Sequence, residues 1–208
     1  MNRPGRLGLS ALALCGTALR PAEAQPTMRV DLARSHVEWT GTKFRGRGKH
    51  EGKVRLLAAQ LDACTPTGCR GRFTVDMHNL EVTDIPATDP VPRRRLTEHL
   101  QSRDFFWTER YPVAIFTLTG TRTTSRADSV LASGQLALRG VTRPLLFTAR
   151  IMRSFEGEVH VRAELTIDRQ QWGIRYRFDP IRNELVDDEI RLVVVLVARA
   201  APAGPYIR

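Results

Sequence analysis

Histidine and cysteine are the residue types in this sequence that could ligate a metal or act in catalysis, so their spacing bears first on chemistry. None of the five histidines stands at H-x-x-x-H or another tight metal-ligand spacing from a second one. Three cysteines are too few for a four-cysteine metal site. The motifs G-x-S-x-G and H-E-x-x-H and the phosphate-binding loop do not occur. We therefore expect no metal site and no enzyme activity, since an enzyme would need a buried cluster of ionisable groups that this spacing does not reveal.

Cys64 and Cys69 are spaced for a disulfide across a tight turn. They flank Thr65-Pro66-Thr67-Gly68, in which Pro and Gly stand at turn-forming positions. If strands run into and out of this turn, directly opposed Cα atoms lie roughly 4.5 to 5.5 Å apart, within the disulfide range. A redox or metal role is the alternative, but the pair is neither C-x-x-C nor close to a histidine pair. We predict a structural disulfide.

A basic, glycine-containing run could bind an anion. Lys43, Arg45, Arg47 and Lys49 lie within KFRGRGKHEGK, and such a run can hold an anionic headgroup through side-chain charge and backbone donors. A solvated loop is the alternative interpretation, and the same two interpretations apply to Arg93-Arg94-Arg95. A later segment, Asp168-Arg169 followed by Trp172-Gly173, predicts a turn held by a local ion pair or side-chain hydrogen bonds.

The first 24 residues have the features of an export signal. Arg3 and Arg6 precede the uncharged stretch Leu7–Leu19, and Ala22-Glu23-Ala24 forms a small-x-small cleavage site. The uncharged stretch is too short to span a bilayer. We predict a signal peptide of residues 1–24 and a periplasmic or secreted domain of residues 25–208. Cys15 offers a lipid-modified N-terminus as the alternative, although it follows Leu14 where bacterial lipoprotein signals usually carry Gly, Ala or Ser.

Length and composition indicate one folded domain. A chain of 208 residues that is 42% hydrophobic and 26% charged can build a core, which excludes a disordered tail protein. Without the predicted signal peptide, 29 basic and 21 acidic side chains give a net charge of +8. The arginines are spread along the chain instead of clustering, so the charge does not indicate nucleic-acid binding.

Alternating apolar and polar residues predict strands with one buried face from residue 35 onward. The segment 189–197 is apolar on both faces, so something must cover its second face. Residues 93–101 lack Gly and Pro and place Leu96 and Leu100 four apart, which predicts a short helix. About eight strands separated by turn signals indicate an antiparallel barrel or sandwich. The segments expected to form these strands are residues 37–39, 52–63, 73–77, 114–118, 129–138, 145–151, 159–167 and 189–197.

Several segments together resemble the YceI-like family of exported polyisoprenoid-binding proteins. Each is weak alone, but their order and spacing are specific, and they extend over nearly all of the mature chain. The strongest is H-L-x-S-x-D-F-F followed by Y-P-x-A-x-F and then L-R-G-V-T-R-P. The segments are SHVEWTGTK at 35–43, GKHEG at 48–52, EHLQSRDFF at 98–106, YPVAIF at 111–116, LALRGVTRP at 136–144 and IDRQQWGI at 167–174.

The resemblance implies an all-β fold: a lipocalin-like antiparallel barrel of eight strands, a short helix near one end, and an apolar tunnel that holds a long isoprenoid chain. The cysteine hairpin is not part of the family pattern, and Arg93-Arg94-Arg95 makes the region before the helix unusually basic. Both departures leave the headgroup preference open.

If the barrel is hollow, its lumen would bind the ligand. We expect no required cofactor, a bound polyisoprenoid or quinone lipid, and a role in transport or storage of that lipid in the cell envelope. The aromatic cluster of Phe105, Phe106 and Trp107, beside the helix, would guard one end, and the basic loop would contact a polar head through Lys43, Arg45, Arg47 and Lys49. The expected lumen residues are Val37, Trp39, Val54, Leu56, Phe73, Val75, Phe116, Leu138, Phe147, Val161, Leu165, Leu192 and Val194.

A solidly packed barrel is the alternative. It would serve as a structural or interaction module whose basic surface binds anionic envelope partners, an anionic membrane among them. Barrels of this size occur in both forms, filled by their own side chains or wide enough for one ligand. The sequence leaves open whether two copies pair as a homodimer, and it does not reveal the chain length or headgroup of the ligand.

Overall fold

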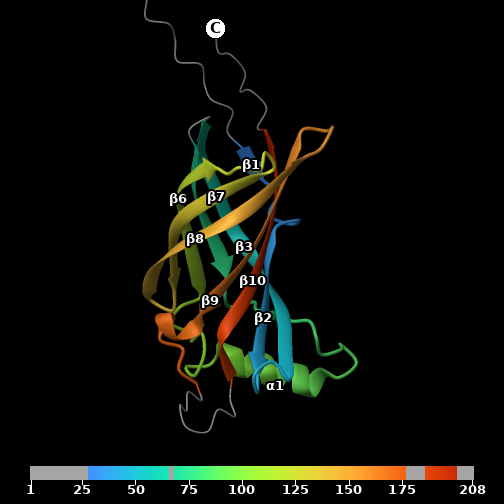
Figure 1. The fold of residues 1–208 in the computed structure, drawn as a ribbon. Coiled ribbons are helices and arrows are strands. Elements are labelled where there is room, and N and C mark those ends of the chain that lie inside the picture. The colour runs from blue at the N-terminus through green and yellow to red at the C-terminus, as the bar shows by residue number, and fades with distance from the viewer. Residues whose placement is uncertain (1–27, 66–67, 177–185, 201–208) are drawn as a thin grey trace, which may run out of the picture.

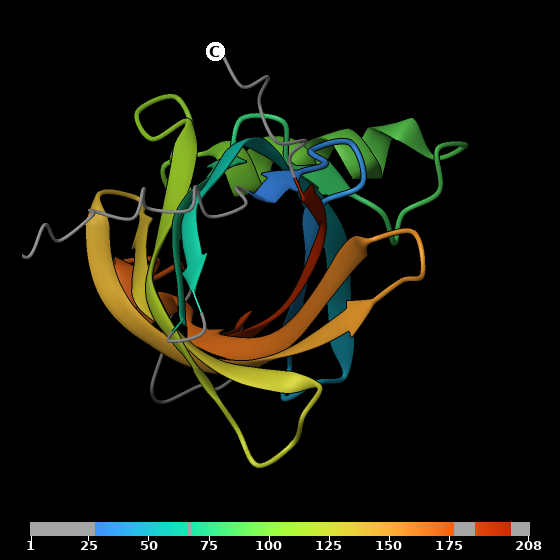
Figure 2. The same cartoon turned by 90° about the horizontal axis from the view of Figure 1, so that it is seen from above.

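Eight antiparallel strands close on themselves into a barrel, as the alternation predicts (Figures 1 and 2). The order around the barrel is β2-β3-β4-β6-β7-β8-β9-β10, and β10 pairs with both β9 and β2 to complete the ring. The predicted fold class is thus confirmed. The strands are β2 (His36–Lys43), β3 (Gly48–Thr65), β4 (Gly68–Asp76), β6 (Val113–Thr123), β7 (Ser129–Leu138), β8 (Val141–Arg153), β9 (Glu158–Asp168) and β10 (Val186–Ala200).

The computed structural model describes residues 28–65, 68–176 and 186–200. The predicted signal peptide, residues 1–24, lies outside the described residues. Two short strands were not predicted: β1 (Met28–Val30), which pairs with β10, and β5 (Glu81–Val82), which pairs with β3. Segments of two or three residues are too short to show a period, so alternation could not reveal them.

Bulges let the longest strand follow the curve of the barrel. The register between β3 and β4 shifts between Leu56 and Ala58 and again between Leu61 and Ala63. Each bulge bends the strand and increases its twist. As a result β3 extends over 18 residues and stays paired with β4 on both sides of the bulges, from Leu56 with Val75 to Cys64 with Cys69.

The helix α1 (Pro90–Gln101) begins three residues before its predicted start. Proline lacks a backbone N–H, but the first turn of a helix has no intrahelical acceptor for that group, so prolines are tolerated there. Leu100 is buried and Leu96 is half-buried against the core, as their spacing predicts. Two members of the basic triplet are paired, Arg93 with Glu81 at 3.3 Å and Arg94 with Glu98 at 3.7 Å.

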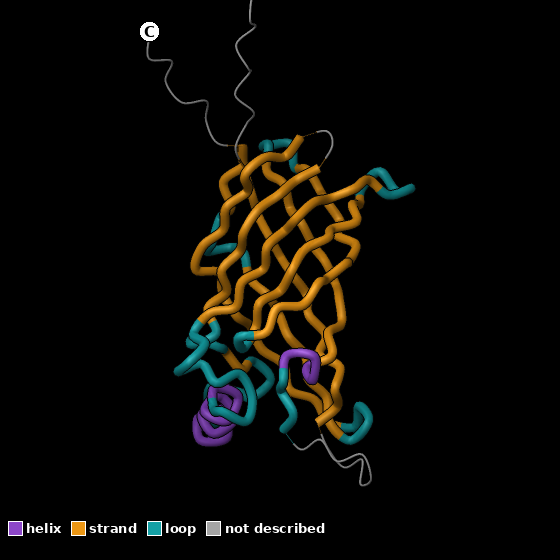
Figure 3. Tube along the Cα trace, turned by 90° about the vertical axis from the view of Figure 1, so that its left-hand side faces the viewer, coloured by secondary structure: helices purple, strands orange, loops and turns teal. Residues whose placement is uncertain are grey.

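The two ends of the barrel carry different elements (Figures 1 and 3). The α1 end carries the helix, the turn between β2 and β3, and the 3-10 helix η1 (Arg169–Trp172). The disulfide end carries β1, the end of β3 and the start of β4, and a β8–β9 hairpin that projects beyond the barrel.

The second apolar face of β10 is covered by side chains on neighbouring strands. Val193 and Val197 point away from the lumen and are nonetheless buried. The cross-strand partners of Val193 are Glu38 and Glu164, and one partner of Val197 is His160. Long polar side chains can lay their aliphatic stems over apolar neighbours while their heads stay in water. The covering predicted for this strand therefore comes from the barrel's own outer surface.

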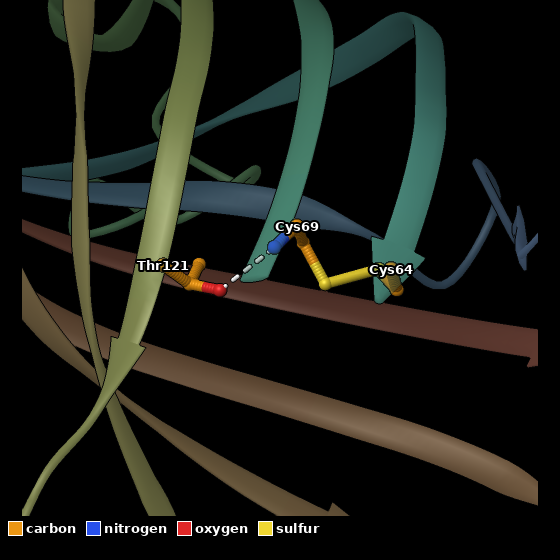
Figure 4. The surroundings of a disulfide bond; sticks show 3 residues. All are labelled: Cys64, Cys69 and Thr121. Atoms are coloured by element: carbon orange, nitrogen blue, oxygen red, sulfur yellow. Dashed lines mark hydrogen bonds between the residues drawn. A yellow bond between two sulfur atoms is a disulfide. The ribbon is translucent and has the colours of Figure 1, made fainter. Parts of the chain in front are cut away.

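Cys64 and Cys69 form the predicted disulfide at the mouth of the disulfide end (Figure 4). They are paired residues of β3 and β4, with Cα atoms 4.1 Å apart. The backbone N–H of Cys69 donates to Thr121 Oγ1 of β6 at 2.9 Å. The disulfide hairpin is thereby attached to the next strand of the barrel.

Glu158 joins three chain segments at the same end. Its carboxylate accepts from Arg34 Nη1 at 2.7 Å, just after β1, and from Arg199 Nε of β10 at 2.7 Å. The hydrogen bonds from Arg34 and Arg199 lower the pKa of Glu158 to about 2, and their charges add to this against the opposing effect of burial. His160 Nε2 lies 3.1 Å from the same carboxylate.

Replacement of both cysteines by serine should lower the free energy of unfolding by about 2 kcal/mol, because the disulfide closes only a short loop in the unfolded chain. Denaturant titration of Cys64→Ser/Cys69→Ser against the oxidised parent measures this loss. Unchanged stability, or two free thiols in the unreduced parent by mass spectrometry, would contradict the structural role.

Glu158→Gln should make the melting temperature depend less on pH below about 4.5. The folded carboxyl has a pKa of about 2, below its ordinary value of 4.5, so its contribution is complete above pH 4.5 and is lost as the pH falls toward 2. Glutamine does not titrate, so the variant should be less stable at neutral pH and lose less on acidification. Melting temperatures across this range test it, with Glu156→Gln on the same hairpin as the control that should follow the parent curve.

Candidate functional site

The strand register places the expected lumen residues of the strands on the inner face of the barrel. Cross-strand partners share a face, and Trp39, Leu192 and Leu165 are successive partners across three strands. Across β4, β6 and β7, Phe73, Phe116 and Leu136 are linked in the same way. The other pairings that define this face are Val37 with Val54 and Val194, Leu56 with Val75, Phe147 with Ala132, Leu138 with Val141, and Val161 with Leu196.

The inner face is apolar along the two strands that close the barrel. From Val159 to Ile167 on β9 and from Ile190 to Ala198 on β10, every inward residue is aliphatic. No titratable side chain interrupts these two rows. An apolar wall of this kind favours a ligand with a hydrocarbon body and gives no group for acid–base chemistry.

Many inner-face side chains are only half-buried. Val54, Leu56, Phe73 and Val75, on β3 and β4, are buried in the core. The inner-face residues of the opposite strands keep partial access to solvent, although they point away from the outer surface. Such access on the inner face of a closed barrel is what a lumen left partly unfilled by side chains would give. The half-buried members are Val37, Trp39, Phe116, Phe147, Val161, Leu165, Leu192 and Val194.

The Trp39 indole packs against a glycine of the neighbouring strand. It lies over Gly52, where a Cβ atom would overlap the Trp39 ring and the Glu81 carbonyl. A glycine at this position therefore gives the large ring its space. The Trp39 Nε1 donor is buried and has no hydrogen-bond partner in the described part of the chain.

An aromatic cluster packs at the α1 end. The ring centroids of His99 and Tyr176 lie 5.0 and 5.1 Å from that of Phe105, and the two lie 4.5 Å from each other. Phe106 packs beside Phe105 at 6.5 Å and against the core. Phe105 and Phe106 were predicted to belong to the site, whereas His99 and Tyr176 were not. His99 and Tyr176 are 77 positions apart in the sequence, so no short-range spacing could indicate their contact.

Trp107 contacts a different set of side chains from this cluster. Its ring packs against the guanidinium groups of Arg103 and Arg110, at 4.6 and 4.9 Å, and against Tyr111. Its backbone has a positive φ of 48°. Consecutive residues of a tight turn point in different directions, so the adjacency of Phe105, Phe106 and Trp107 in sequence did not make them one cluster.

The basic run Lys43–Lys49 extends from the last residue of β2, through the turn between β2 and β3, into the start of β3 at the α1 end. Asp187 of β10 holds it: the carboxylate accepts from Thr42 Oγ1 at 2.5 Å and from the backbone N–H groups of Arg45 and Gly46 at 3.1 and 3.0 Å. Burial alone would raise the pKa of Asp187, but these hydrogen bonds hold it below its ordinary value. The run is therefore an ordered turn, in which Lys49 also pairs with Glu51 at 3.0 Å.

Arg169 is a buried cation that connects η1 to the start of β10. Its guanidinium donates to the backbone carbonyls of Ile174, Val186 and Asp187 at 2.7 to 3.2 Å and pairs with Asp188 at 3.0 Å. Burial lowers its pKa, and the Asp188 charge opposes this. The predicted local turn is confirmed, because the Asp168 carboxylate accepts from Gln170 N at 2.9 Å. The long-range partners of Arg169 had no sequence signal.

Four histidines each lie beside one carboxylate: His36 beside Glu38, His50 beside Asp84, His99 beside Asp104 and His160 beside Glu158. Across residues 28–65, 68–176 and 186–200, no group of three or more His, Cys, Asp or Glu side chains is arranged to hold a metal ion. Within the same ranges, no helix has the length and apolar character needed to cross a membrane.

Comparison with known proteins supports one family. A family model described as the YceI-like domain matches residues 28–198. A UPF0312 protein of Photorhabdus laumondii is 34% identical over 87 residues, which are 39% of this chain and 44% of that protein. Protein YceI of Escherichia coli O157:H7 is 32% identical over 87 residues, with the same two shares. These matches span less than half the length of the curated relatives.

Two solved structures share the fold. BcnA of Burkholderia cenocepacia has a TM-score of 0.67 at 17% identity, covering 81% of this chain and 99% of that one. A polyisoprenoid binding domain from Saccharophagus degradans, described as implicated in plant cell wall breakdown, has a TM-score of 0.60 at 16% identity. That match covers 85% of this chain and all of the other. At these identities the likeness concerns the fold alone.

Arg169→Lys should destabilise the protein by about 2 kcal/mol, because one ammonium group cannot serve three buried carbonyls and a carboxylate that a guanidinium reaches together. Denaturant titration gives the change. Arg143→Lys is the matched control: Arg143 is exposed and donates to one carbonyl, that of Gln171. Equal stability of the two variants would show that Arg169 does not hold the start of β10.

Proposed function

The chain belongs to the YceI-like family, and we propose that it is a non-enzymatic binding protein for a long-chain polyisoprenoid lipid or quinone. A structural relative in the comparison is a polyisoprenoid binding domain, which supports a lipid ligand here. The proposal extends to transport or storage of that lipid in the cell envelope, in keeping with the export signal predicted for residues 1–24.

The half-buried aliphatic inner face is the observation that carries the proposal. Along β9 and β10 the wall offers hydrocarbon and no titratable group. Burial of a methylene contributes about 0.8 kcal/mol before the cost of ordering the chain, and micromolar affinity needs about 8 kcal/mol. A few isoprene units in contact with this wall are therefore enough for useful binding.

The α1 end supplies the polar and aromatic groups of the proposed site. Phe105 and Phe106 pack there with His99 and Tyr176, where they can guard the lumen. The basic side chains in and beside the β2–β3 turn lie at the same end, where they can contact a polar or phosphorylated head: Lys43, Arg45, Arg47 and Lys49. The apolar body of the ligand would then lie toward the disulfide end.

Organic extraction of protein purified from an exporting host, followed by mass spectrometry, tests the proposal directly. The expected result is an isoprenoid or quinone in the extract, or uptake of added isoprenoid by the emptied protein. If neither is observed, the carrier hypothesis fails, and the packed interaction module takes its place.

Val194→Phe should weaken isoprenoid binding roughly tenfold, because its ring displaces about two methylene contacts at about 0.8 kcal/mol each. Val194 faces the lumen and is half-buried, so the larger ring has room in an unfilled barrel. Val195→Phe is the matched control, since the same change occurs one residue along on the outer face, beside His36 and Arg162.

Uptake of a labelled isoprenoid and thermal stability are measured on both variants. A hollow barrel predicts loss of uptake for Val194→Phe alone, with little change in its melting temperature. A packed barrel would instead make Val194→Phe strongly destabilising, since overfilled cores lose about 1 to 3 kcal/mol. Equal uptake by both variants would contradict a site in the lumen.

A further inference from the structure

The β2–β3 turn presents an aromatic ring to solvent. Phe44 is 45% exposed and lies at the start of the turn, with a φ of 55°. Arg45 and Gly46 continue in the same left-handed region, at 55° and 81°. A bulky residue at positive φ is unfavourable, and such strain persists only where the surroundings hold it. Here Asp187 holds it, through the backbone N–H groups of Arg45 and Gly46.

The turn and the strand ends beside it are rich in cations. Lys43 Nζ lies 5.9 Å from the Phe44 ring centroid, and Arg45, Arg47 and Lys49 follow within the turn or directly after it. Of the nearby carboxylates, Glu51 pairs with Lys49, whereas Asp187 accepts from the turn backbone and Thr42, and Asp188 pairs with Arg169. Among the described residues, Arg47 has no carboxylate within ion-pair distance.

A preformed turn with one exposed aromatic ring among cations matches the surface of an anionic bilayer. The ring can enter the boundary between headgroups and acyl chains, while the cations contact the phosphates. We propose that the β2–β3 turn docks the protein on anionic phospholipid membranes, with the α1 end facing the bilayer. This inference rests on the proposed function and extends it by naming the membrane as the partner of the basic turn.

A second exposed aromatic residue, Phe155, provides a contrast. Phe155, at the tip of the projecting β8–β9 hairpin, is more exposed than Phe44. It lies at the disulfide end and is followed directly by Glu156, which an anionic surface would repel. Exposure of an aromatic ring alone would favour Phe155, whereas the combination of ring and charge favours Phe44. The two positions therefore give a matched pair.

Co-sedimentation of the full mature chain with vesicles tests the inference, using phosphatidylcholine alone or mixed with phosphatidylglycerol and no isoprenoid. Binding should need phosphatidylglycerol and weaken as salt is raised. Phe44→Asn should weaken it about tenfold through lost apolar burial, and Arg47→Gln about fivefold through one lost surface charge. Arg122 is an exposed residue of β6 at the disulfide end, next to the Thr121 that contacts the disulfide hairpin, and serves as the charge control. Phe155→Asn and Arg122→Gln should bind as the parent does.

Asparagine is chosen because it tolerates the left-handed region better than phenylalanine, so Phe44→Asn keeps the turn. Its melting temperature should match that of the parent, and Phe44→Leu should retain most of the binding. Parent-like binding by Phe44→Asn, or an equal loss in Phe155→Asn, would overturn the inference.

The vesicle assay and the uptake assay fail separately. If the parent binds vesicles through Phe44 but takes up no isoprenoid, the lumen proposal is wrong. The docking surface is then supported, but not as part of lipid transfer. If isoprenoid uptake is intact and vesicles are not bound, the docking surface alone is wrong.

Discussion

Closure of the sheet through β10 is the constraint on which the rest of the structure depends. β10 pairs with β9 on one side and with β2 on the other, so neither strand is left as a free edge. Once the ring is closed, alternating residues are divided between an inner and an outer surface that do not exchange. The aliphatic inner rows of β9 and β10 then become a wall that is screened from the outside solution.

Both ends of this closing strand are held by arginine. At its start, Arg169 binds the carbonyls of Val186 and Asp187 and pairs with Asp188. Near its end, Arg199 shares the Glu158 carboxylate with Arg34. Unpaired charges within the wall would cost free energy of desolvation, whereas at the rims they reach carbonyls, carboxylates and water. These two arginine clusters therefore lie at the ends of β10, and the inner rows of β9 and β10 between them are hydrocarbon.

The same arrangement links closure to the candidate functional surfaces. Asp187 lies in the segment that Arg169 holds, and it orders the turn that carries Phe44 and the four cations. The apolar lumen and the basic turn are thus attached to one strand. A binding protein that must both shield a hydrocarbon chain and approach a charged surface needs these two environments close together but separate, and β10 supplies the connection.

The sequence by itself determined the local features of this protein. A two-residue period decides which side chains share a face, so the inward set, including Val37, Phe116 and Leu165, could be read without coordinates. Cys64 and Cys69 are five positions apart in sequence, so the geometry of one turn was enough to predict their pairing. Tertiary structure alone decided what depends on strand register and long-range approach: the hold of Asp187 on a turn 141 residues away, the carbonyl partners of Arg169, and the separation of Trp107 from Phe105. The physical reason is that periodicity acts between neighbours in sequence, whereas a buried hydrogen bond needs two distant segments to meet, which only the closed barrel brings about.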